Sequence, residues 1–381
     1  MFCIYLDGEI LHKNNTKAIA RDISLNLEDN SAGTLSFTID NDHPAYAYVS
    51  TINKSHEVYV VDNGDEIFRG RIVSSSDGDY HDITFNVEGQ LAYLNDSLVR
   101  PFATYADDNL KAGTTLIGNT ADIVVEYLIR NHNIYGSSDT HVKLGKCEVN
   151  SQLNIVVEDY STVGSCLSTH ILDDLGAHAK MYMKDGVRYL DILDNGGGLN
   201  GQKVELGVNL KSYGHEADSS EIYTAIVPEF TIGDQNYTID QVITGGIYND
   251  IIQIDDSRAI NTTAAAEYGL KETHINYRAV DKETAAQLLF SDVEMLSDVY
   301  DTVTISAVDL SLIDPTIQPF RLLDWVEIVA REYNIDKWMM CSAISMSDDP
   351  TKTEYTFGTI LPTLTAGVVR SEKAYNGMSN G

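Results

Sequence analysis

Basic side chains are scarce in this sequence. Its 381 residues include 26 lysines and arginines but 57 aspartates and glutamates, which gives a formal net charge of −31. Sequence-independent binding of nucleic acid depends on basic side chains that neutralise phosphates, so the composition argues against a DNA- or RNA-binding protein. A surface this acidic repels DNA and helps to keep the protein in solution.

Cysteine is also scarce, and the four cysteines are not grouped. Cys3, Cys147, Cys166 and Cys341 form no Cys-x-x-Cys pair. Their number alone allows metal binding or a disulfide, but cysteines scattered in this way are typical of core thiols in a protein made in a reducing cytoplasm. We therefore predict neither a metal site nor a disulfide.

Long apolar segments are missing as well. No run approaches the roughly 20 residues that span a bilayer. The N-terminal stretch MFCIYLDGEI has neither the basic start nor the long apolar core of a signal peptide, and it is typical of a strand that enters a turn at Asp7-Gly8. These features predict a protein that is not inserted in a membrane and that leaves its cell by lysis rather than by secretion.

Common catalytic motifs are absent. The chain contains no His-Glu-x-x-His and no Gly-x-Ser-x-Gly, and no cysteine stands beside a plausible base. Ser165-Cys166 and His170 lie on an apolar helical stripe, which favours packing over a nucleophile or a ligand. Adjacent carboxylates are expected by chance in so acidic a chain, and glycosidase pairs are defined by spatial separation. Such pairs occur at Asp107-Asp108, Asp173-Asp174, Asp255-Asp256 and Asp348-Asp349.

Two acidic, glycine-containing stretches are similar to calcium-binding loops. They are DGDYHD at 77–82 and DNGGGLNG at 194–201. Neither has the EF-hand pattern with its glutamate at position twelve, so hairpin turns are the better interpretation. The three glycines at 196–198 are not followed by a helix with Lys-Ser or Lys-Thr, which excludes a phosphate loop. We predict no catalytic, cofactor-binding or metal-binding residues and no cofactor.

The clearest positive pattern is a β meander over residues 58–98. Apolar residues alternate with polar ones in three segments, which gives each strand one buried and one wet face. Asn63-Gly64 and Asp77-Gly78 provide the positive φ that tight hairpins need. Gly70 lies inside the second strand, where a missing side chain indicates a bulge or a sharp bend.

This region resembles a known family. IFRGRI at 67–72, followed by a strand and by EGQLAYLNDSLVRPF at 88–102, is similar to the N-terminal hub region of phage tail proteins. These are the tail-associated lysin, or prophage endopeptidase tail, proteins of phages and prophages of Gram-positive bacteria. In that family the pattern closes a first β-barrel.

The resemblance extends along the chain. IRNHN at 129–133 and VRYLDIL at 187–193 match the middle domain of the family, and the strands after residue 302 match its second barrel. SEIYTAIVPEF has Glu229-Phe230 where the family has Leu-Gly. Leu323 stands where glycine is usual, which puts the local bend in doubt.

Helical spacing appears in three places. Thr120 is a plausible N-cap for the first helix, and the second helix runs from 162 towards Gly176, a plausible C-terminal residue with positive φ. A third helix is expected from Asp281 to about Tyr300, with an apolar stripe along one side.

These observations together predict an α+β, β-rich fold with two small β-barrels. The two β modules share the same succession of strands, which indicates a structural duplication. The predicted parts are a first β-barrel at 1–104, an α+β middle domain at 105–210, a second β-barrel at 211–254 and 301–365, a helical insertion at 255–300, and a C-terminal tail at 366–381.

The resemblance implies a structural protein, not an enzyme, in the tail tip of a phage, prophage or tailocin. It implies a homotrimeric ring that adapts a sixfold tail to a threefold tip, contacts the distal tail protein ring and other baseplate proteins, and lets DNA pass without specific binding. Similar hubs occur in contractile tails. We expect assembly in the host bacterial cytoplasm and a final location in the virion tail. Two alternatives stay open: a tail-associated peptidase or murein hydrolase, and a receptor-binding tail module.

Overall fold

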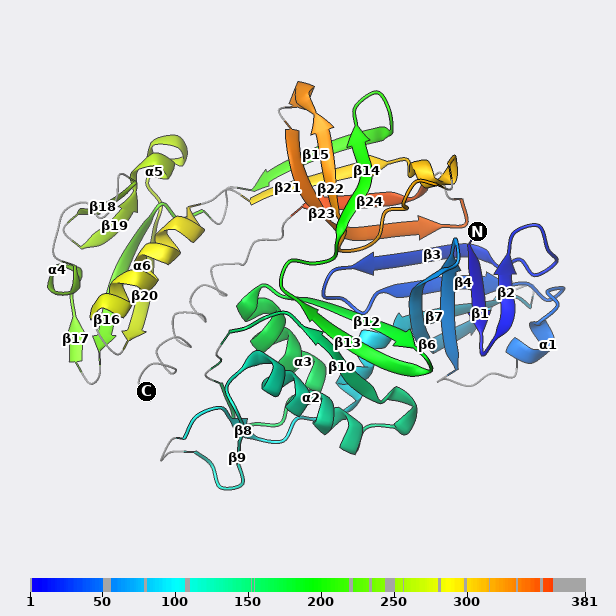
Figure 1. The fold of residues 1–381 in the computed structure, drawn as a ribbon, viewed down its shortest axis with the longest axis horizontal. Helices are drawn as coiled ribbons and strands as arrows, with labels where there is room; N and C mark the ends of the chain where they lie inside the picture. The colour runs from blue at the N-terminus through cyan, green and yellow to red at the C-terminus, as the bar shows by residue number, and fades with distance from the viewer. Residues whose placement is uncertain are drawn as a thin grey trace.

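Most strands in the described part of the chain belong to one sheet. The computed structural model describes residues 2–50, 56–78, 81–106, 110–151, 153, 155–218, 222–232, 235–243, 251–255, 257–279, 282–297, 300–314, 316–333, 335–349 and 352–358. Its largest sheet has thirteen strands, and two three-stranded sheets and one five-stranded sheet accompany it. The predicted α+β, β-rich fold class is confirmed (Figure 1).

The first β module is formed by the N-terminal strands. Its strands are hydrogen-bonded in the order β3-β4-β7-β6-β5-β1-β2. In β7 the side chains alternate between the core and the surface, as predicted. The elements are β1 (Cys3–Leu6), β2 (Glu9–Lys13), β3 (Arg21–Glu28), β4 (Thr34–Ile39), α1 (Tyr46–Val49), β5 (Glu57–Asp62), β6 (Asp65–Asp77) and β7 (Ile83–Gly89).

Two of the expected turn features of this module are present. Asn63 and Gly64 have φ angles of 52° and 96°, which confirms the tight β5–β6 turn. At Gly70 a Cβ atom would lie 2.0 Å from the carbonyl oxygen of Glu88, so β6 and β7 approach each other at a distance that only glycine allows. A register shift between β6 and β7 follows at Ile72 and Ser74.

The second β module repeats the strand order of the first. Its order β15-β21-β24-β23-β22 corresponds to β3-β4-β7-β6-β5, whereas the outer strands differ: β14 pairs with β22 in parallel and β1 pairs with β5 antiparallel. The long strands β6 and β23 each pair with one neighbour along their first half and another along their second half. This correspondence supports the predicted duplication. The elements are β14 (Leu199–Glu205), β15 (Leu210–Asp218), β21 (Tyr300–Ala307), η4 (Leu310–Leu312), β22 (Trp325–Ala330), η5 (Arg331–Tyr333), β23 (Ile335–Ser347) and β24 (Glu354–Gly358).

The two modules are joined by one antiparallel ladder between β3 and β23. It runs from Ala343 opposite Glu28 to Ser347 opposite Ser24. The sheet is therefore one continuous path through both modules, and two separately closed barrels are not confirmed within the described residues. The alternating pattern of a strand does not reveal which strand pairs with its free edge, so the sequence could not show this connection.

The middle domain lies between the two modules in the sequence and has its own core. Helices α2 and α3 pack on β10 and β13, and this core also includes Leu94 and Val99, which precede the predicted boundary at 105. The domain ends with β13, because β14 and β15 pair within the second module. Its elements are η1 (Gln90–Asp96), β8 (Phe102–Ala103), β9 (Thr115–Leu116), α2 (Ala121–Tyr135), η2 (Ser138–Thr140), β10 (Val142–Cys147), β11 (Val156–Val157), α3 (Val163–Leu167), η3 (Ser168–Asp173), β12 (His178–Lys184) and β13 (Val187–Leu193).

The predicted helix ends of the middle domain are largely confirmed. Thr120 occupies the N-cap position of α2 with extended backbone angles, although its hydroxyl donates to Asp122 instead of capping a backbone N–H. The helix that begins after Thr162 continues as a π-helical turn, η3, which the sequence pattern did not predict. Gly176 then has a φ of 63°, as expected at a helix C-terminus.

The insertion is larger than predicted and is not only helical. Residues 225–232, 235–237 and 252–254, assigned above to the second barrel, form a separate five-stranded sheet together with β19 and β20. Helix α6 covers this sheet and begins next to Asp281, which lies outside the described residues. The elements are β16 (Ala225–Ile232), β17 (Gln235–Tyr237), α4 (Ile239–Val242), β18 (Ile252–Asp255), β19 (Arg258–Asn261), α5 (Thr262–Tyr268), β20 (Glu272–Ala279) and α6 (Lys282–Leu296).

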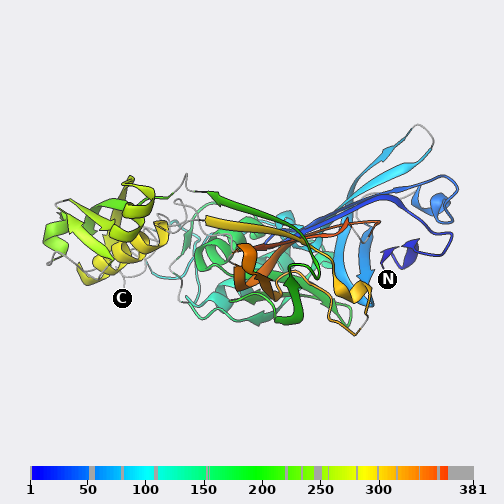
Figure 2. The same ribbon diagram turned by 90° about the horizontal axis from the view of Figure 1, so that it is seen from above.

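The position of the insertion follows from the duplication. It connects β15 to β21, whereas the equivalent strands β3 and β4 of the first module are connected by the short turn at 29–33. Figures 1 and 2 show the yellow-green insertion at one end of the molecule and the blue first module at the other. The predicted C-terminal tail at 366–381 lies outside the described residues.

Leu323 adopts a backbone conformation that is typical of glycine. Its φ is 71°, and its side chain is buried against Leu193 and Met340. The backbone N–H of Leu323 donates to the carbonyl oxygen of Cys341 at 2.8 Å, and its own carbonyl oxygen accepts from Gly197 at 2.8 Å. These bonds hold the bend, although a left-handed conformation costs a non-glycine residue about 1–2 kcal/mol.

We predict that Leu323→Gly is more stable than Leu323→Ala by about 1 kcal/mol, because both lose the leucine contacts but only alanine keeps the backbone strain. Urea unfolding of the two variants measures the difference. Leu322, the neighbouring residue, does not have a positive φ. There the glycine variant should be less stable than the alanine variant. An alanine variant at 323 that is more stable than the glycine variant would contradict the strain argument.

Candidate functional site

Cys166 and His170, considered above as a possible nucleophile and a possible ligand, have packing or ion-pair neighbours, and so does His132. Cys166 is buried in the core of the middle domain, and His170 lies 3.8 Å from Asp174 one helical turn away. His132 is completely buried, with Nδ1 2.9 Å from the Ser97 hydroxyl and Nε2 2.9 Å from the Thr140 carbonyl. Burial lowers the pKa of His132, so the ring is neutral and serves packing.

Two of the adjacent carboxylates are engaged in ion pairs. Asp255 pairs with Arg258 at 3.0 Å, and Asp349 lies 3.7 Å from Lys352. Asp107, Asp108 and Asp256 lie outside the described residues. Over the part of the chain that the structure describes, no group of three His, Cys, Asp or Glu side chains is placed to hold a metal ion. The absence of catalytic, cofactor and metal sites remains a prediction.

Both loops that are similar to calcium sites take part in hydrogen bonds that account for their shape. At 77–82 the N–H of Gly78 donates to the carbonyl of Asp82 at 2.9 Å. At 194–201 the N–H of Gly197 bonds to the Leu323 carbonyl, and the indole N–H of Trp325 donates to the Asn195 carbonyl at 2.7 Å. The second loop therefore secures the bend before β22. None of the helices within the described residues is long and apolar enough to cross a membrane.

The most unusual chemical feature is a buried arginine where the first module meets the middle domain. The side chain of Arg188, on β13, is only 4% exposed. It donates to Glu57 on β5 at 2.9 Å, to the Gln90 side chain at 3.0 Å and to the Asp139 carbonyl at 2.9 Å. A buried guanidinium is tolerated only when its charge and its donors are matched in this way. Arg188 therefore ties β13 to β5 and to η1.

Two more arginines extend this arrangement along β6. Arg69 donates to Glu66 at 2.7 Å and also bonds Glu57, whereas Arg71 pairs with Glu88 and Asp96. The ring of Tyr93 lies between Arg71 and Arg188, with each guanidinium carbon 4.9 Å from the ring centroid. Burial raises the pKa of Tyr93 to about 12. We call Arg69, Arg71, Arg188, Tyr93 and their carboxylate partners the arginine cluster.

A second set of contacts ties the second module to this junction. Arg321 lies 3.1 Å from Asp65 and 3.6 Å from Asp62 in the first module. The turn between β3 and β4 contacts the middle domain through Asp29, which is 2.6 Å from His178. In the same turn Asn30 donates to the Ala177 carbonyl and accepts from the Ala179 N–H, both at 2.9 Å. All three units are thus held by polar contacts.

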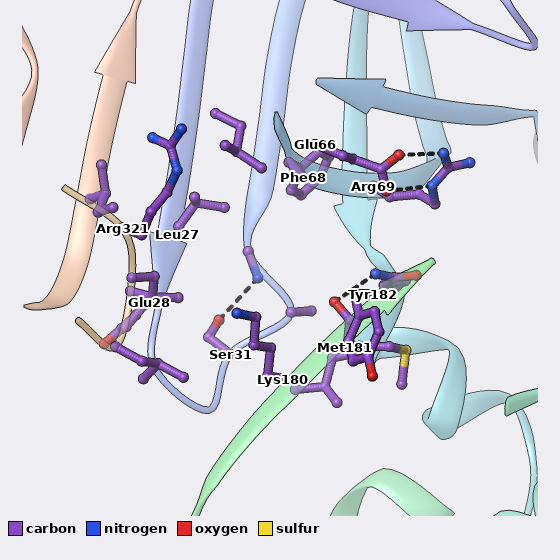
Figure 3. A pocket seen from close by; sticks show the side chains of 18 of the residues that line it. Leu27, Glu28, Ser31, Glu66, Phe68, Arg69, Lys180, Met181, Tyr182 and Arg321 are labelled. Atoms are coloured by element: carbon purple, nitrogen blue, oxygen red, sulfur yellow. Dashed lines mark hydrogen bonds and ion pairs between the residues drawn. The ribbon is translucent and has the colours of Figure 1, made fainter. Parts of the chain in front are cut away.

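A cavity of 380 Å³ lies where the three units meet. Figure 3 shows Leu27, Phe68, Met181 and Arg321 around it, and the Glu66–Arg69 ion pair at its side. Leu27 comes from the first module, Met181 from the middle domain and Arg321 from the second module. Most of the charged groups at its wall are paired with one another, so the arrangement is suited to holding the units in a defined orientation rather than to acid–base chemistry.

An exposed aromatic patch lies on the middle domain. The guanidinium of Arg100 lies 3.7 Å from the ring centroid of Tyr135 and 5.4 Å from that of Tyr160. Both tyrosines and nearby Leu98 are exposed. Tyrosine and arginine are enriched among the residues that contribute most to protein–protein binding, so this patch is chemically suited to a protein partner.

Sequence reasoning did not assign roles to these arginines. Arg69 and Arg71 are part of the IFRGRI motif and Arg188 is part of VRYLDIL, but the motifs were interpreted only as strands. A usable signal was present, because three arginines on predicted strands are conspicuous in a chain with so few basic residues. The identity of their partners depends on the packing of distant segments.

No protein-family model matches the chain, and no curated protein matches it in sequence. Solved structures do match over its whole length. The 43 kDa tail protein of prophage MuSo2 from Shewanella oneidensis is 14% identical with a TM-score of 0.60, and covers 96% of this chain and 98% of its own. The tail protein from Neisseria meningitidis MC58 is 14% identical with a TM-score of 0.59, covering 97% and 98%.

A third structure, prophage tail protein gp18 from Listeria monocytogenes EGD-e, is 12% identical with a TM-score of 0.52 and covers 98% of each chain. The chain has the fold of prophage tail proteins. At these identities the similarity concerns the fold. It agrees with the resemblance found in the sequence, whereas the restriction to phages of Gram-positive bacteria and the link to lysins remain predictions.

We predict that Arg188→Met lowers the free energy of unfolding by about 3 kcal/mol, because Glu57 and Gln90 lose a buried partner. Urea unfolding measures the change. Arg331→Met is the matched control, since the Arg331 side chain is 80% exposed and lies 3.4 Å from Asp336. Loss of this surface pair should change stability by less than about 0.5 kcal/mol. Equal effects of the two substitutions would refute the structural role of Arg188.

Proposed function

We propose that this chain is a structural protein of a phage or phage-like tail and forms the hub at the tail tip. The observation that carries the proposal is the full-length similarity of its fold to prophage tail proteins. The absence of recognisable catalytic motifs in the sequence and the packing roles of Cys166 and His132 agree with a non-enzymatic part.

The proposed assembly is a homotrimeric ring. Each chain has two β modules with the same strand order, so three chains present six similar modules. Such a ring matches sixfold neighbours, here proposed to be the distal tail protein ring, and keeps threefold symmetry for the tip. Similar hubs of contractile tails would follow the same geometry. In this proposal the protein assembles in the host cytoplasm and becomes part of the virion tail.

We further propose that DNA passes through this ring without specific binding. The chain carries a formal charge of −31, and its few basic residues include Arg69, Arg71 and Arg188, which are engaged in the arginine cluster. A wall with few free cations does not hold phosphates, so DNA stays hydrated and mobile beside it.

The trimer is tested by light scattering of the purified chain. We expect the mass of three chains at high protein concentration in about 0.5 M salt, because salt screens the repulsion between acidic subunits. At low salt the average mass should fall towards one chain. A strict monomer under all conditions, including mixtures with the distal tail protein, would rule out the proposed ring.

The charge argument predicts that the protein does not bind duplex DNA at about 0.15 M salt, measured by fluorescence anisotropy of a labelled duplex. In a structure of the trimer, acidic residues should outnumber basic residues on the channel side by more than the overall 57 to 26. Tight binding to the duplex, or a neutral or basic channel, would contradict the proposed passage of DNA.

A further inference from the structure

The contact between the two modules of one chain suggests how two chains meet. Within the chain, β3 of the first module pairs with the second half of β23 of the second module. Asn26 lies opposite Ser345 in this ladder, and the Ser345 hydroxyl is 2.8 Å from the Asn26 side-chain oxygen. This ladder is a contact of module with module along a sheet edge.

The duplication identifies the strands that correspond to β3 and β23. In the first module Thr34 on β4 pairs with Asn26 on one side and with Glu88 on the other. In the second module Thr302 on β21 pairs with Glu216 on one side and with Gly358 on the other. In both modules the register shift lies between the two residues that directly precede Glu88 or Gly358, so Glu88 and Gly358 are equivalent. Glu216 on β15 is therefore the equivalent of Asn26 on β3.

The same comparison relates the long strands. Thr84 lies four residues before Glu88 and pairs with Ser76. Glu354 lies four residues before Gly358 and pairs with Ser345. A register shift lies at the same place in both ladders, between the residues four and two positions before these serines. Ser76 on β6 is therefore the equivalent of Ser345 on β23.

In contrast to β3 and β23, their equivalents each have one sheet edge that forms no ladder with another described strand. β15 pairs only with β21, and the second half of β6 pairs only with β7. Residues 74–77 of β6 are exposed. Figure 2 shows the light-blue strands β6 and β7 at the end of the molecule remote from the insertion, whereas β15, in green, runs towards the insertion. The two strands lie in different parts of the molecule and are not paired with each other within one chain.

We propose that β15 of one copy pairs antiparallel with the second half of β6 of the next copy, in the register that places Glu216 opposite Ser76. This contact between two chains has the same pairing as the ladder that β3 and β23 form within one chain. It is a head-to-tail contact, which closes into a ring and leaves no sheet edge unpaired at these positions. This inference rests on the proposed ring and names the strands that build it.

The register can be tested with a pair of cysteines. Residues directly opposite each other in an antiparallel ladder have Cα atoms about 4.5–5.5 Å apart, which is within the range of a disulfide. In the variant Ser76→Cys/Glu216→Cys, mild oxidation at about 0.5 M salt should give covalent dimers and trimers on a non-reducing gel. Three chains should be the largest species, and reductant should return all of them to single chains.

Matched variants show whether cross-linking depends on the register of the ladder or results from chance collisions between chains. Asn26→Cys/Ser345→Cys tests the equivalent ladder within one chain and should form an intramolecular disulfide without a change in mass. Ser76→Cys/Ser212→Cys displaces the second cysteine by four residues, about 13 Å, and should give no covalent trimer. The unmodified chain controls for its own thiols, of which only Cys147 is not fully buried.

The outcomes distinguish this inference from the proposed function. Trimers in light scattering without cross-linking at 76 and 216, or with equal cross-linking in the displaced variant, would overturn the strand pairing and leave the hub intact. A register-specific ladder that extends beyond three chains would support the pairing and contradict the closed trimer. A protein that is monomeric and not cross-linked under every condition would overturn both.

Discussion

The structure depends above all on the ladder between β3 and β23. This ladder joins two β modules whose strands come from opposite ends of the chain. Leu27 on β3 and Met346 on β23 pack against the cores of both modules, so the ladder unites two cores as well as two sheets. The turn that follows β3 then contacts the middle domain through Asp29 and Asn30. One strand and the turn after it therefore contact all three units.

The acidic composition gives the arginine cluster a particular role. Buried or half-buried carboxylates at the junction need cations, and the chain has few. Arg69, Arg71 and Arg321 each contact two carboxylates, while Arg188 combines one carboxylate with two neutral acceptors. Placing these cations inside the junction stabilises it and leaves the surface more acidic than the composition alone suggests. The same arrangement serves both cohesion and, in the proposed ring, the passage of DNA.

The duplication also explains how a large insertion is tolerated. The first module closes the β3–β4 connection with a short turn, and the second module places a complete sheet with helix α6 between β15 and β21. A hairpin end tolerates such a change because the strands on either side keep their own ladder and core. The insertion has a separate core around Phe230, Tyr277 and Leu289, so it adds its own stability.

Local signals in the sequence determined the local structure. The alternation of residues 83–89, the Asn63-Gly64 turn and the helix that ends at Gly176 depend on neighbours within a few positions, and all were accessible from the sequence. The sequence left the bend at Leu323 in doubt, and its bonds to Gly197 and Cys341 come from distant segments. The pairing of β3 with β23, the separate sheet of the insertion and the partners of Arg188 were decided by tertiary structure alone. A strand has the same alternating pattern whichever partner its edge meets, and a guanidinium accepts any carboxylate that folding brings within reach.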